Sequence, residues 1–498
     1  MPITRFTETD ARDTQALVKT GFGTLRGGCY LLLRIGDPRP AAFWLRGLTL
    51  PSCADIGGGR IVTEAVQLAL TAAGLRALGH DAALVAAFAP EFAVGLAEDP
   101  SRSRRLGDTG SNAPEHWDWG AGAREPHVLL MLFTAPDRVD ALAQRLRDEA
   151  VAAGLSVIAE LPTGDMKGRE PFGFLDGISQ PSVDWRNERQ PGSAADMDFH
   201  NFVAPGEVLL GYDNEYGLLT ERPLLDPRAA GAETLPAAAD KPDKRDLGRN
   251  GTYLVFRQLD QDVRGFWRWV TQEAGESGIT DLAEAMVGRR MSGEPFAALG
   301  NQDIPGIEDR KRNSFTYALD PAGHVCPFGG HIRRANPRTG DYPGGRTGLI
   351  KKLIALFGLS GTPEADRIAA SRFHRLLRRG REYGAWLDPA EATKPDAPDP
   401  KSGLHFICLN ANLARQFEFV QGAWLANAKF GGLTGEQDPL LGNRLPFPGS
   451  QETDRFTRPH ADGPCRVARH LPQFVRLRGG AYFFLPGLRA KDWLLRDQ

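Results

Sequence analysis

The sequence is poor in cysteine and contains no long apolar segment. Its five cysteines among 498 residues are odd in number and widely scattered, and none belongs to a Cys-x-x-Cys pair. This spacing supports neither a disulfide framework nor a structural zinc site. No segment approaches the roughly 20 apolar residues that a membrane-spanning helix needs. We therefore expect neither a membrane protein nor a small disulfide-rich domain.

The chain also lacks an excess of charge of either sign, since its formal net charge is -2. This balance gives no general basic field and does not suggest nucleic acid as a partner. Charged residues make up 24% and apolar residues 41%, an ordinary globular mixture, and 498 residues would usually form two or more lobes. Residues 1–10 carry early acidic side chains and no apolar stretch of signal-peptide length, so we expect a cytoplasmic protein.

A short apolar run followed by a turn and a helix-compatible segment recurs four times. Apolar runs of this length suit buried strands, and the segments that follow carry apolar residues at roughly helical spacing. The expected strand and helix pairs are 29–35 with 41–47, 127–133 with 139–151, 252–258 with 263–270, and 404–410 with 413–424. One further strand is expected at residues 155–160.

This repeated order suggests two copies of a split βαβ unit. Such a unit is the ferredoxin-like arrangement, in which helices cover one face of an antiparallel sheet. An unrelated α+β fold explains the pattern about equally well, so the pattern alone leaves both folds open. The charged, turn-rich residues 241–251 are a plausible boundary between two lobes.

Two short stretches carry most of the chemical information. Residues 173–177 (Gly-Phe-Leu-Asp-Gly) place Asp176 in a turn with glycine on both sides, which permits unusual backbone angles and close approach of a ligand. Residues 326–338 place His331 after a glycine pair, at the start of a strongly basic run expected to be helical. Each stretch also has a plainer explanation. A Gly-x-x-Asp-Gly sequence is usually an ordinary turn, and one histidine among ten is more often structural than a ligand.

In this order the two stretches resemble the dye-decolourising (DyP-type) haem peroxidases. Residues 171–181 closely match the family's Gly-x-x-Asp-Gly block, and residues 326–333 resemble its Cys-Pro-Phe-x-x-His-[Ile/Val]-Arg segment. The resemblance implies that Asp176 is the distal acid and base that moves the peroxide proton. It also implies that His331 is the proximal iron ligand. His324, just upstream, is the local competitor and lies outside the match.

A third block places the distal cation. Residues 376–380 (Leu-Leu-Arg-Arg-Gly) resemble the family's block around its distal arginine, which implies that role for Arg378. A guanidinium there would stabilise developing negative charge and keep the nearby carboxylate ionised. The alternative is a basic solvated face or a dimer contact, the expectation for Arg375, Arg379 and Arg381. The long separation from the histidine block suggests that residues 339–370 are an insertion.

The resemblance also implies residues around the cofactor. A carboxylate that accepts the second imidazole hydrogen increases electron donation to iron. Asp438, in an Asp-Pro-x-x-Gly context, is favoured for that role over Glu418, which could face solvent or pair with an arginine. Cations after His331, Arg334 among them, would suit the two haem propionates.

Apolar and aromatic residues complete the expected site. Leu404 and Phe406 would share one side of their strand, and in the family such side chains cover the distal haem face. Tyr383, Trp386 and Trp424 lie near the site motifs in sequence and could relay electrons from the surface, although plain packing explains them equally well.

With the resemblance, the ferredoxin-like alternative is favoured. We expect an α+β protein of two ferredoxin-like lobes with antiparallel sheets, residues 1–245 with the Gly-x-x-Asp-Gly motif and residues 246–498 with the proximal histidine. Haem would be held between the sheet and the helices of the C-terminal lobe.

The implied function is that of a peroxidase with one haem b per chain. Its expected partners are hydrogen peroxide and bulky organic donors, dyes and phenolics, which lose one electron at a time. No nucleic acid or membrane partner is expected, and a homo-oligomer is compatible with the sequence. Two rivals are a non-catalytic haem-handling protein and a non-enzymatic assembly protein on the same scaffold. Neither rival needs the proton-moving pair Asp176 and Arg378.

Overall fold

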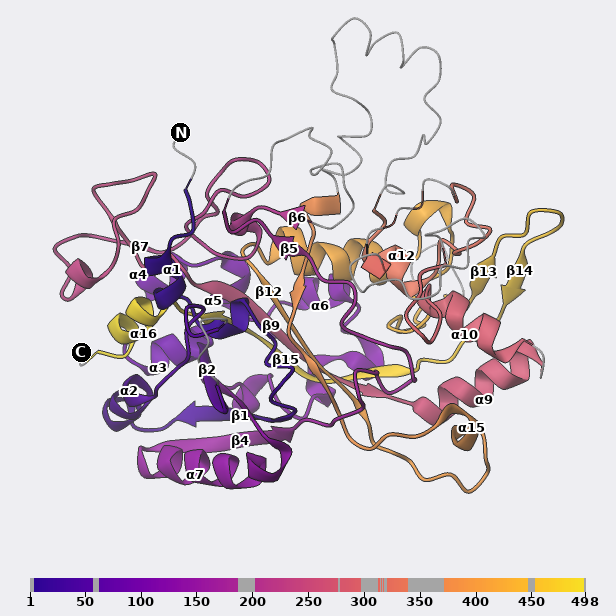
Figure 1. The fold of residues 1–498 in the computed structure, drawn as a ribbon, viewed down its shortest axis with the longest axis horizontal. Coiled ribbons are helices and arrows are strands. Elements are labelled where there is room, and N and C mark those ends of the chain that lie inside the picture. The colour runs from indigo at the N-terminus through magenta and orange to yellow at the C-terminus, as the bar shows by residue number, and fades with distance from the viewer. Residues whose placement is uncertain are drawn as a thin grey trace, which may run out of the picture.

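Both halves of the chain contribute to one antiparallel β-sheet (Figure 1). Its strand order is β10-β12-β9-β15-β2-β3-β1-β4, and β11 also pairs with β12. The computed structural model describes residues 4–56, 62–186, 202–275, 278–296, 312–313, 315, 317, 320–338, 371–446 and 453–496. The expected insertion at residues 339–370 lies outside this described part.

The N-terminal half forms a split βαβ unit. Its elements are β1 (Gly27–Ile35), α2 (Pro38–Gly47), β2 (Glu64–Leu70), β3 (Val128–Thr134), α7 (Val139–Ala152) and β4 (Leu155–Pro162). Strand β1 lies between β3 and β4, and β3 also pairs with β2, with every pair antiparallel. The turn into α2 is local in origin, because Asp37 accepts a hydrogen bond from the Arg39 amide and Pro38 begins the helix.

The C-terminal half repeats this arrangement. Its elements are β9 (Thr252–Gln261), α9 (Val263–Ala274), α10 (Ile279–Val287), β10 (Leu377–Arg378), β11 (Arg381–Tyr383), β12 (Gly403–Asn410), two π-helical turns (Ala414–Glu418 and Val420–Leu425) and β15 (Val475–Leu485). The order β15-β9-β12, completed by β10 and β11, is again ferredoxin-like. The halves join where Phe484 of β15 pairs with Leu70 of β2. The predicted α+β fold of two ferredoxin-like units is confirmed.

Two details differ from the pattern-based expectation. The segment after β12 is π-helical rather than a regular helix. Strand β2 was not predicted, because Gln67 interrupts its apolar run. That side chain is buried and satisfied, since its amide accepts a hydrogen bond from the Leu17 amide and donates to the Pro51 carbonyl.

The segment that carries Asp176 packs against the C-terminal unit. Phe172 and Phe174 belong to the same buried cluster as Phe266 and Trp267 of α9, and the rings of Phe172 and Phe266 lie 4.5 Å apart. The Gly-x-x-Asp-Gly turn is therefore held over the C-terminal sheet. The division of the chain at residue 245 stays a prediction.

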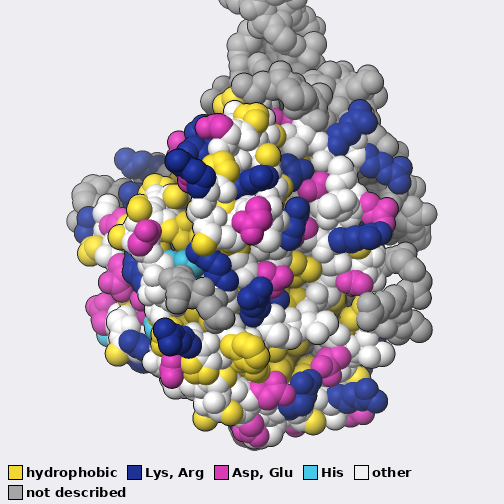
Figure 2. Space-filling view, turned by 90° about the vertical axis from the view of Figure 1, so that its left-hand side faces the viewer, with side chains coloured by type: hydrophobic (Ala, Val, Ile, Leu, Met, Phe, Trp, Pro, Cys, Tyr) yellow, Lys and Arg dark blue, Asp and Glu magenta, His cyan; other side chains and the backbone are white. Residues whose placement is uncertain are grey.

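The surface carries both signs of charge. On the face drawn in Figure 2, basic and acidic side chains are interspersed rather than separated by sign, in keeping with the net charge of -2. Among the described residues, no helix has the length and apolar character needed to cross a bilayer.

Candidate active site

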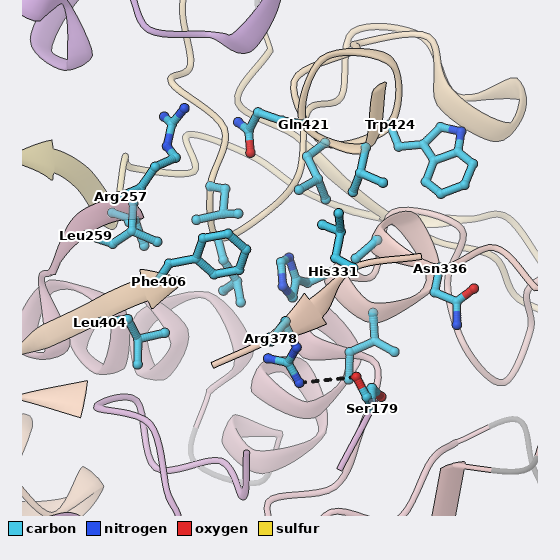
Figure 3. A pocket seen from close by; sticks show the side chains of 18 of the residues that line it. Ser179, Arg257, Leu259, His331, Asn336, Arg378, Leu404, Phe406, Gln421 and Trp424 are labelled. Atoms are coloured by element: carbon cyan, nitrogen blue, oxygen red, sulfur yellow. Dashed lines mark hydrogen bonds between the residues drawn. The ribbon is translucent and has the colours of Figure 1, made fainter. Parts of the chain in front are cut away.

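A cavity lies between strands β9 and β12 on one side and several loop and helical segments on the other (Figure 3). The strands contribute alternate residues, so that Leu259, Leu404 and Phe406 all face it. The turn at residues 174–179 and the helix α12 (His331–Ala335) also line it. The wall is mostly apolar, with charged groups at a few places, as is typical of a cofactor site.

The backbone of the glycine turn fixes Asp176 at the cavity. Gly173 and Gly177 adopt φ angles of 105° and 82°, which side-chain-bearing residues rarely reach. Glu170 accepts hydrogen bonds from the amides of Phe172 and Phe174, each at 3.0 Å, and holds the turn from behind. Burial raises the pKa of this Glu170 carboxyl to about 7.

Arg378 forms an ion pair with Asp176 in the lining of the cavity. Its Nη1 donates to Asp176 Oδ1 at 3.0 Å. The arginine is placed by β10, where Arg378 pairs with Cys408 of β12, and by Gln180. The Gln180 Oε1 accepts from the Arg378 amide at 3.0 Å, and its Nε2 donates to the Arg378 carbonyl at 3.2 Å. Sequence reasoning did not single out Gln180, although it lies inside the matched block.

The surroundings keep the Asp176 carboxyl ionised. Burial by itself would raise its pKa, but the charge and hydrogen bond of Arg378, with the Gly177 amide, lower the pKa below its usual value. Its side chain is 40% accessible because it faces the cavity. A carboxylate in this position can accept a proton from a bound ligand over a wide pH range.

The neighbouring arginines do not form the solvated basic face that was the alternative to a site role. Arg379 donates to the carbonyls of Leu17 and Val18, and Arg381 donates to carbonyls of residues 21–26. Arg375 is 9% exposed and lines the cavity. The expectation of a solvated face is wrong because the chain folds back over these side chains and its carbonyls need donors.

His331 faces the same cavity from the first position of α12. Its Nδ1 and the Asp438 Oδ2 form a hydrogen bond of 2.9 Å, which leaves Nε2 as the ring nitrogen free to bind a ligand. Burial would lower the pKa of the imidazole, but Asp438 raises it above its ordinary value. His324 is exposed and lies outside the cavity lining, so the structure gives it no route to the same ligand.

Asp438 is fully buried behind the imidazole. Its second oxygen, Oδ1, accepts from the amides of Leu440 and Leu441 at 2.9 and 2.8 Å. Burial would raise the pKa of this carboxyl, but the positive charge and hydrogen bond of His331, with smaller contributions from Arg334 and the Leu441 amide, lower it. A carboxylate held on both oxygens fixes the orientation of the imidazole.

Glu418, the alternative partner, is turned away from the imidazole. It pairs with Arg102 at 2.7 Å and accepts from the Tyr482 hydroxyl at 2.9 Å.

Arg334 corrects one expectation, because it lies outside the cavity lining. Its guanidinium is fully buried and donates to the carbonyls of Trp424, Asn427 and Glu436. With both Nη atoms bonded to backbone carbonyls, Arg334 supports the segment behind the imidazole rather than lining the cavity.

The aromatic candidates differ in exposure. Trp424 is only 8% exposed and lines the cavity, so it is not a surface residue. Trp386 is 42% exposed, and Tyr383 is partly exposed with its hydroxyl bonded to the Leu259 carbonyl at 3.2 Å. Figure 3 shows Trp424 and Phe406 on either side of His331.

Haem fits the chemistry of this cavity. One imidazole nitrogen is free, a buried carboxylate stands behind it, and the walls are lined by apolar side chains that suit a porphyrin. Leu404 and Phe406 both line the cavity, and their position over a distal haem face stays a prediction.

No protein-family model matches the chain, whereas curated dye peroxidases and their solved structures are similar to it. The multifunctional dye peroxidase DyP2 of Amycolatopsis sp. is 29% identical over an alignment of 483 residues that covers 92% of this chain and 90% of that protein. The dye-decolorizing peroxidase AauDyP1 of Auricularia auricula-judae is 27% identical and covers 86% of this chain and 74% of its own. A crystal structure of a fungal DyP-type peroxidase from Auricularia auricula-judae superposes with a TM-score of 0.73 at 24% identity, covering 98% and 99% of the two chains.

An ancestral D-type dye decolorizing peroxidase superposes similarly, with a TM-score of 0.72 at 23% identity over 98% of this chain and 99% of that one. The solved structures support the fold, and the curated relatives extend the likeness to the sequence of nearly the whole chain. On these grounds the chain is similar to the dye-decolourising peroxidases in fold and, over most of its length, in sequence.

Proposed function

We propose that this protein is a haem b peroxidase that reduces hydrogen peroxide and oxidises bulky organic donors such as dyes and phenolics. The observation that carries the proposal is that the Asp176–Arg378 pair and the Asp438-bonded His331 face one apolar cavity. Similarity to the dye-decolourising peroxidases supports the enzyme class, a DyP-type peroxidase with peroxide as electron acceptor, EC 1.11.1. When bound, haem supplies the iron centre at which peroxide is reduced and donors are oxidised one electron at a time.

Asp176 and Arg378 are proposed to act together on peroxide. The Asp176 carboxylate would accept a proton from one peroxide oxygen and return it to the other as the O–O bond breaks, so that water leaves. General acid–base work of this kind typically contributes about 10²–10⁴-fold in rate. Arg378 holds the negative charge that develops as the O–O bond polarises, and it keeps Asp176 ionised between turnovers.

His331 is proposed to bind the haem iron, and Asp438 is proposed to orient the His331 imidazole. Because Asp438 accepts the Nδ1 hydrogen, His331 keeps the Nε2 lone pair turned toward the ligand. The buried negative charge behind the ring increases the electron donation of the imidazole. Leu404 and Phe406 are proposed to cover the distal face and exclude water.

Bulky donors cannot enter a buried cavity, so their electrons are proposed to pass through the protein. Tyr383 is suited to this role because it is partly exposed and its hydroxyl contacts the Leu259 carbonyl on the cavity wall. Trp386 offers a more exposed ring nearby in sequence. A cytoplasmic location also belongs to the proposal, and five free cysteines, four of them buried, suit a reducing compartment.

The optical spectrum tests the proposal directly. Purified protein supplied with haem should show a Soret band whose intensity corresponds to one haem per chain. Hydrogen peroxide should shift this band, and a dye donor should return it to its original position. Dye should be consumed only when peroxide and haem are both present. A protein that binds haem but leaves dye and peroxide untouched would instead support the haem-handling alternative. A protein without a Soret band after haem addition would support the assembly alternative.

A further inference from the structure

Arg375 is the unusual charge in the cavity. It lies just before β10, lines the cavity and is 9% exposed. Its side chain has no hydrogen bond or ion pair within the part of the chain that the structure describes. Its backbone is well held, because its carbonyl accepts from Gln416 Nε2 at 2.7 Å. The fold therefore fixes the backbone from which the side chain enters the cavity, and nothing in the described chain neutralises its guanidinium.

The other arginines of the cavity are all partnered. Arg378 pairs with Asp176, and Arg257 forms a bidentate ion pair with Asp108. The third, Arg289, donates to Ser179 Oγ at 2.9 Å and to two backbone carbonyls. Four arginines line the described cavity, and Arg375 alone lacks an acceptor.

Burial and the neighbouring positive charges disfavour an unpaired guanidinium at Arg375. Burial lowers the pKa of Arg375 well below its ordinary value, and the positive charges of Arg338, Arg378 and Arg372 lower it further. An unpaired buried cation is disfavoured by several kcal/mol, whereas a guanidinium with a carboxylate forms two parallel charge-assisted hydrogen bonds. Asp176, the carboxylate of the distal pair, is already used by Arg378. The missing anion must come from the molecule that fills the cavity.

We propose that Arg375 binds a propionate carboxylate of the haem and so anchors the cofactor on the distal-arginine segment. The assignment rests on the proposed function, and it transfers to Arg375 the propionate role that the sequence gave to Arg334. A planar guanidinium suits a carboxylate better than a lysine ammonium does, since it offers a rigid pair of donors.

The test compares two porphyrins that differ only in their carboxylates. Haem-depleted protein is titrated with haem and with haem dimethyl ester, in which both propionates are esterified, and the Soret band reports binding. Arg375→Met removes the charge and keeps most of the length of the side chain. This variant should bind haem about 10–100-fold more weakly, the range for one charge-assisted hydrogen-bonded pair, and bind the ester as the wild type does. Arg375→Lys should recover part of the loss.

A second measurement separates ligand binding from folding. Without haem, Arg375→Met should melt no lower than the wild type, because it removes an unpaired buried charge. The matched control is Arg379→Met, whose loss of bonds to the Leu17 and Val18 carbonyls should lower the melting temperature of the haem-free protein.

Two results would overturn the assignment while leaving the peroxidase proposal intact. One is an equal loss of haem and ester binding in Arg375→Met, and the other is no loss of either. A wild-type protein that binds neither porphyrin would overturn the proposed function, and the assignment with it.

Discussion

Arg378 Nη1 lies 3.0 Å from Asp176 Oδ1, although 202 positions separate the two residues in the chain. A short edge strand supplies the cation and a glycine turn supplies the carboxylate. Because each charge stabilises the other, the pair works as one unit.

Removal of the distal pair should reveal this coupling. Asp176→Asn keeps the shape but deletes the base, and should slow the first peroxide-dependent spectral change by about 10²–10⁴-fold. Arg378→Leu removes a fixed cation and should slow the same step by about 10²–10³-fold. The double variant should lose less than the product of the single losses, since both residues act on one transition state.

Stopped-flow spectroscopy on the three variants measures these rates. Near-wild-type rates in Arg378→Leu would assign the distal cation to another arginine. Near-wild-type rates in all three variants would refute the mechanism.

The pH dependence should follow the Asp176 carboxyl. Arg378 holds the pKa of Asp176 below its ordinary value of 3.8. Because the folded-state pKa is lowered, the carboxylate stays ionised below pH 3.8 and is protonated only as the pH falls through its lowered pKa. The stability that the pair contributes is fully present above pH 3.8 and is lost as the pH falls through that lowered pKa. Dye oxidation should therefore favour acid over neutral pH in the wild type.

In Arg378→Leu the acid limb of the rate profile should move to higher pH, because the cation no longer favours the charged form. Rate profiles of both proteins, with the Soret band monitored for haem loss, provide the check. A wild-type maximum at pH 8 or above with haem retained would contradict the role of Asp176.

Loss of the imidazole should abolish cofactor retention. His331→Ala removes the only imidazole that lines the described cavity next to a buried carboxylate, so the variant should lose haem or bind it loosely. His324→Ala is the matched control and should keep the wild-type spectrum, since His324 is exposed outside the cavity. Stoichiometric haem with an unchanged spectrum in His331→Ala would show that the ligand is misassigned.

The carboxylate behind the imidazole should affect both haem binding and the reduction potential of the iron. In Asp438→Asn the group accepting the Nδ1 hydrogen becomes a neutral amide, so haem affinity or activity should fall by about 10–100-fold. Glu418→Gln should have no such effect, because Glu418 pairs with Arg102 and Tyr482. The measurement is haem titration together with the iron reduction potential, and unaltered values in Asp438→Asn would remove the proposed role.

The sequence by itself determined the elements and the chemically central residues. Apolar runs and helical spacing located β1, β3, β9 and β12 with the helices after them, because burial of one face imposes a period that is visible in the chain. Two motif blocks singled out Asp176 and His331, since glycine turns and glycine-preceded basic helices are local features. Strand β2 escaped this reasoning because Gln67, a polar residue, is buried in it with its bonds satisfied.

Only the tertiary structure decided which charges are free to act. The sequence assigned the distal role to Arg378 only through its resemblance to the family block, and it favoured Arg334 for the cofactor. It gave Arg375 no role in the site. In the fold, hydrogen bonds to backbone carbonyls of distant segments are donated by Arg379, Arg381 and Arg334. Arg378 reaches a carboxylate and Arg375 is left facing the cavity. The partner of a long side chain depends on which distant backbone folds over it, and that is a property of the three-dimensional arrangement alone.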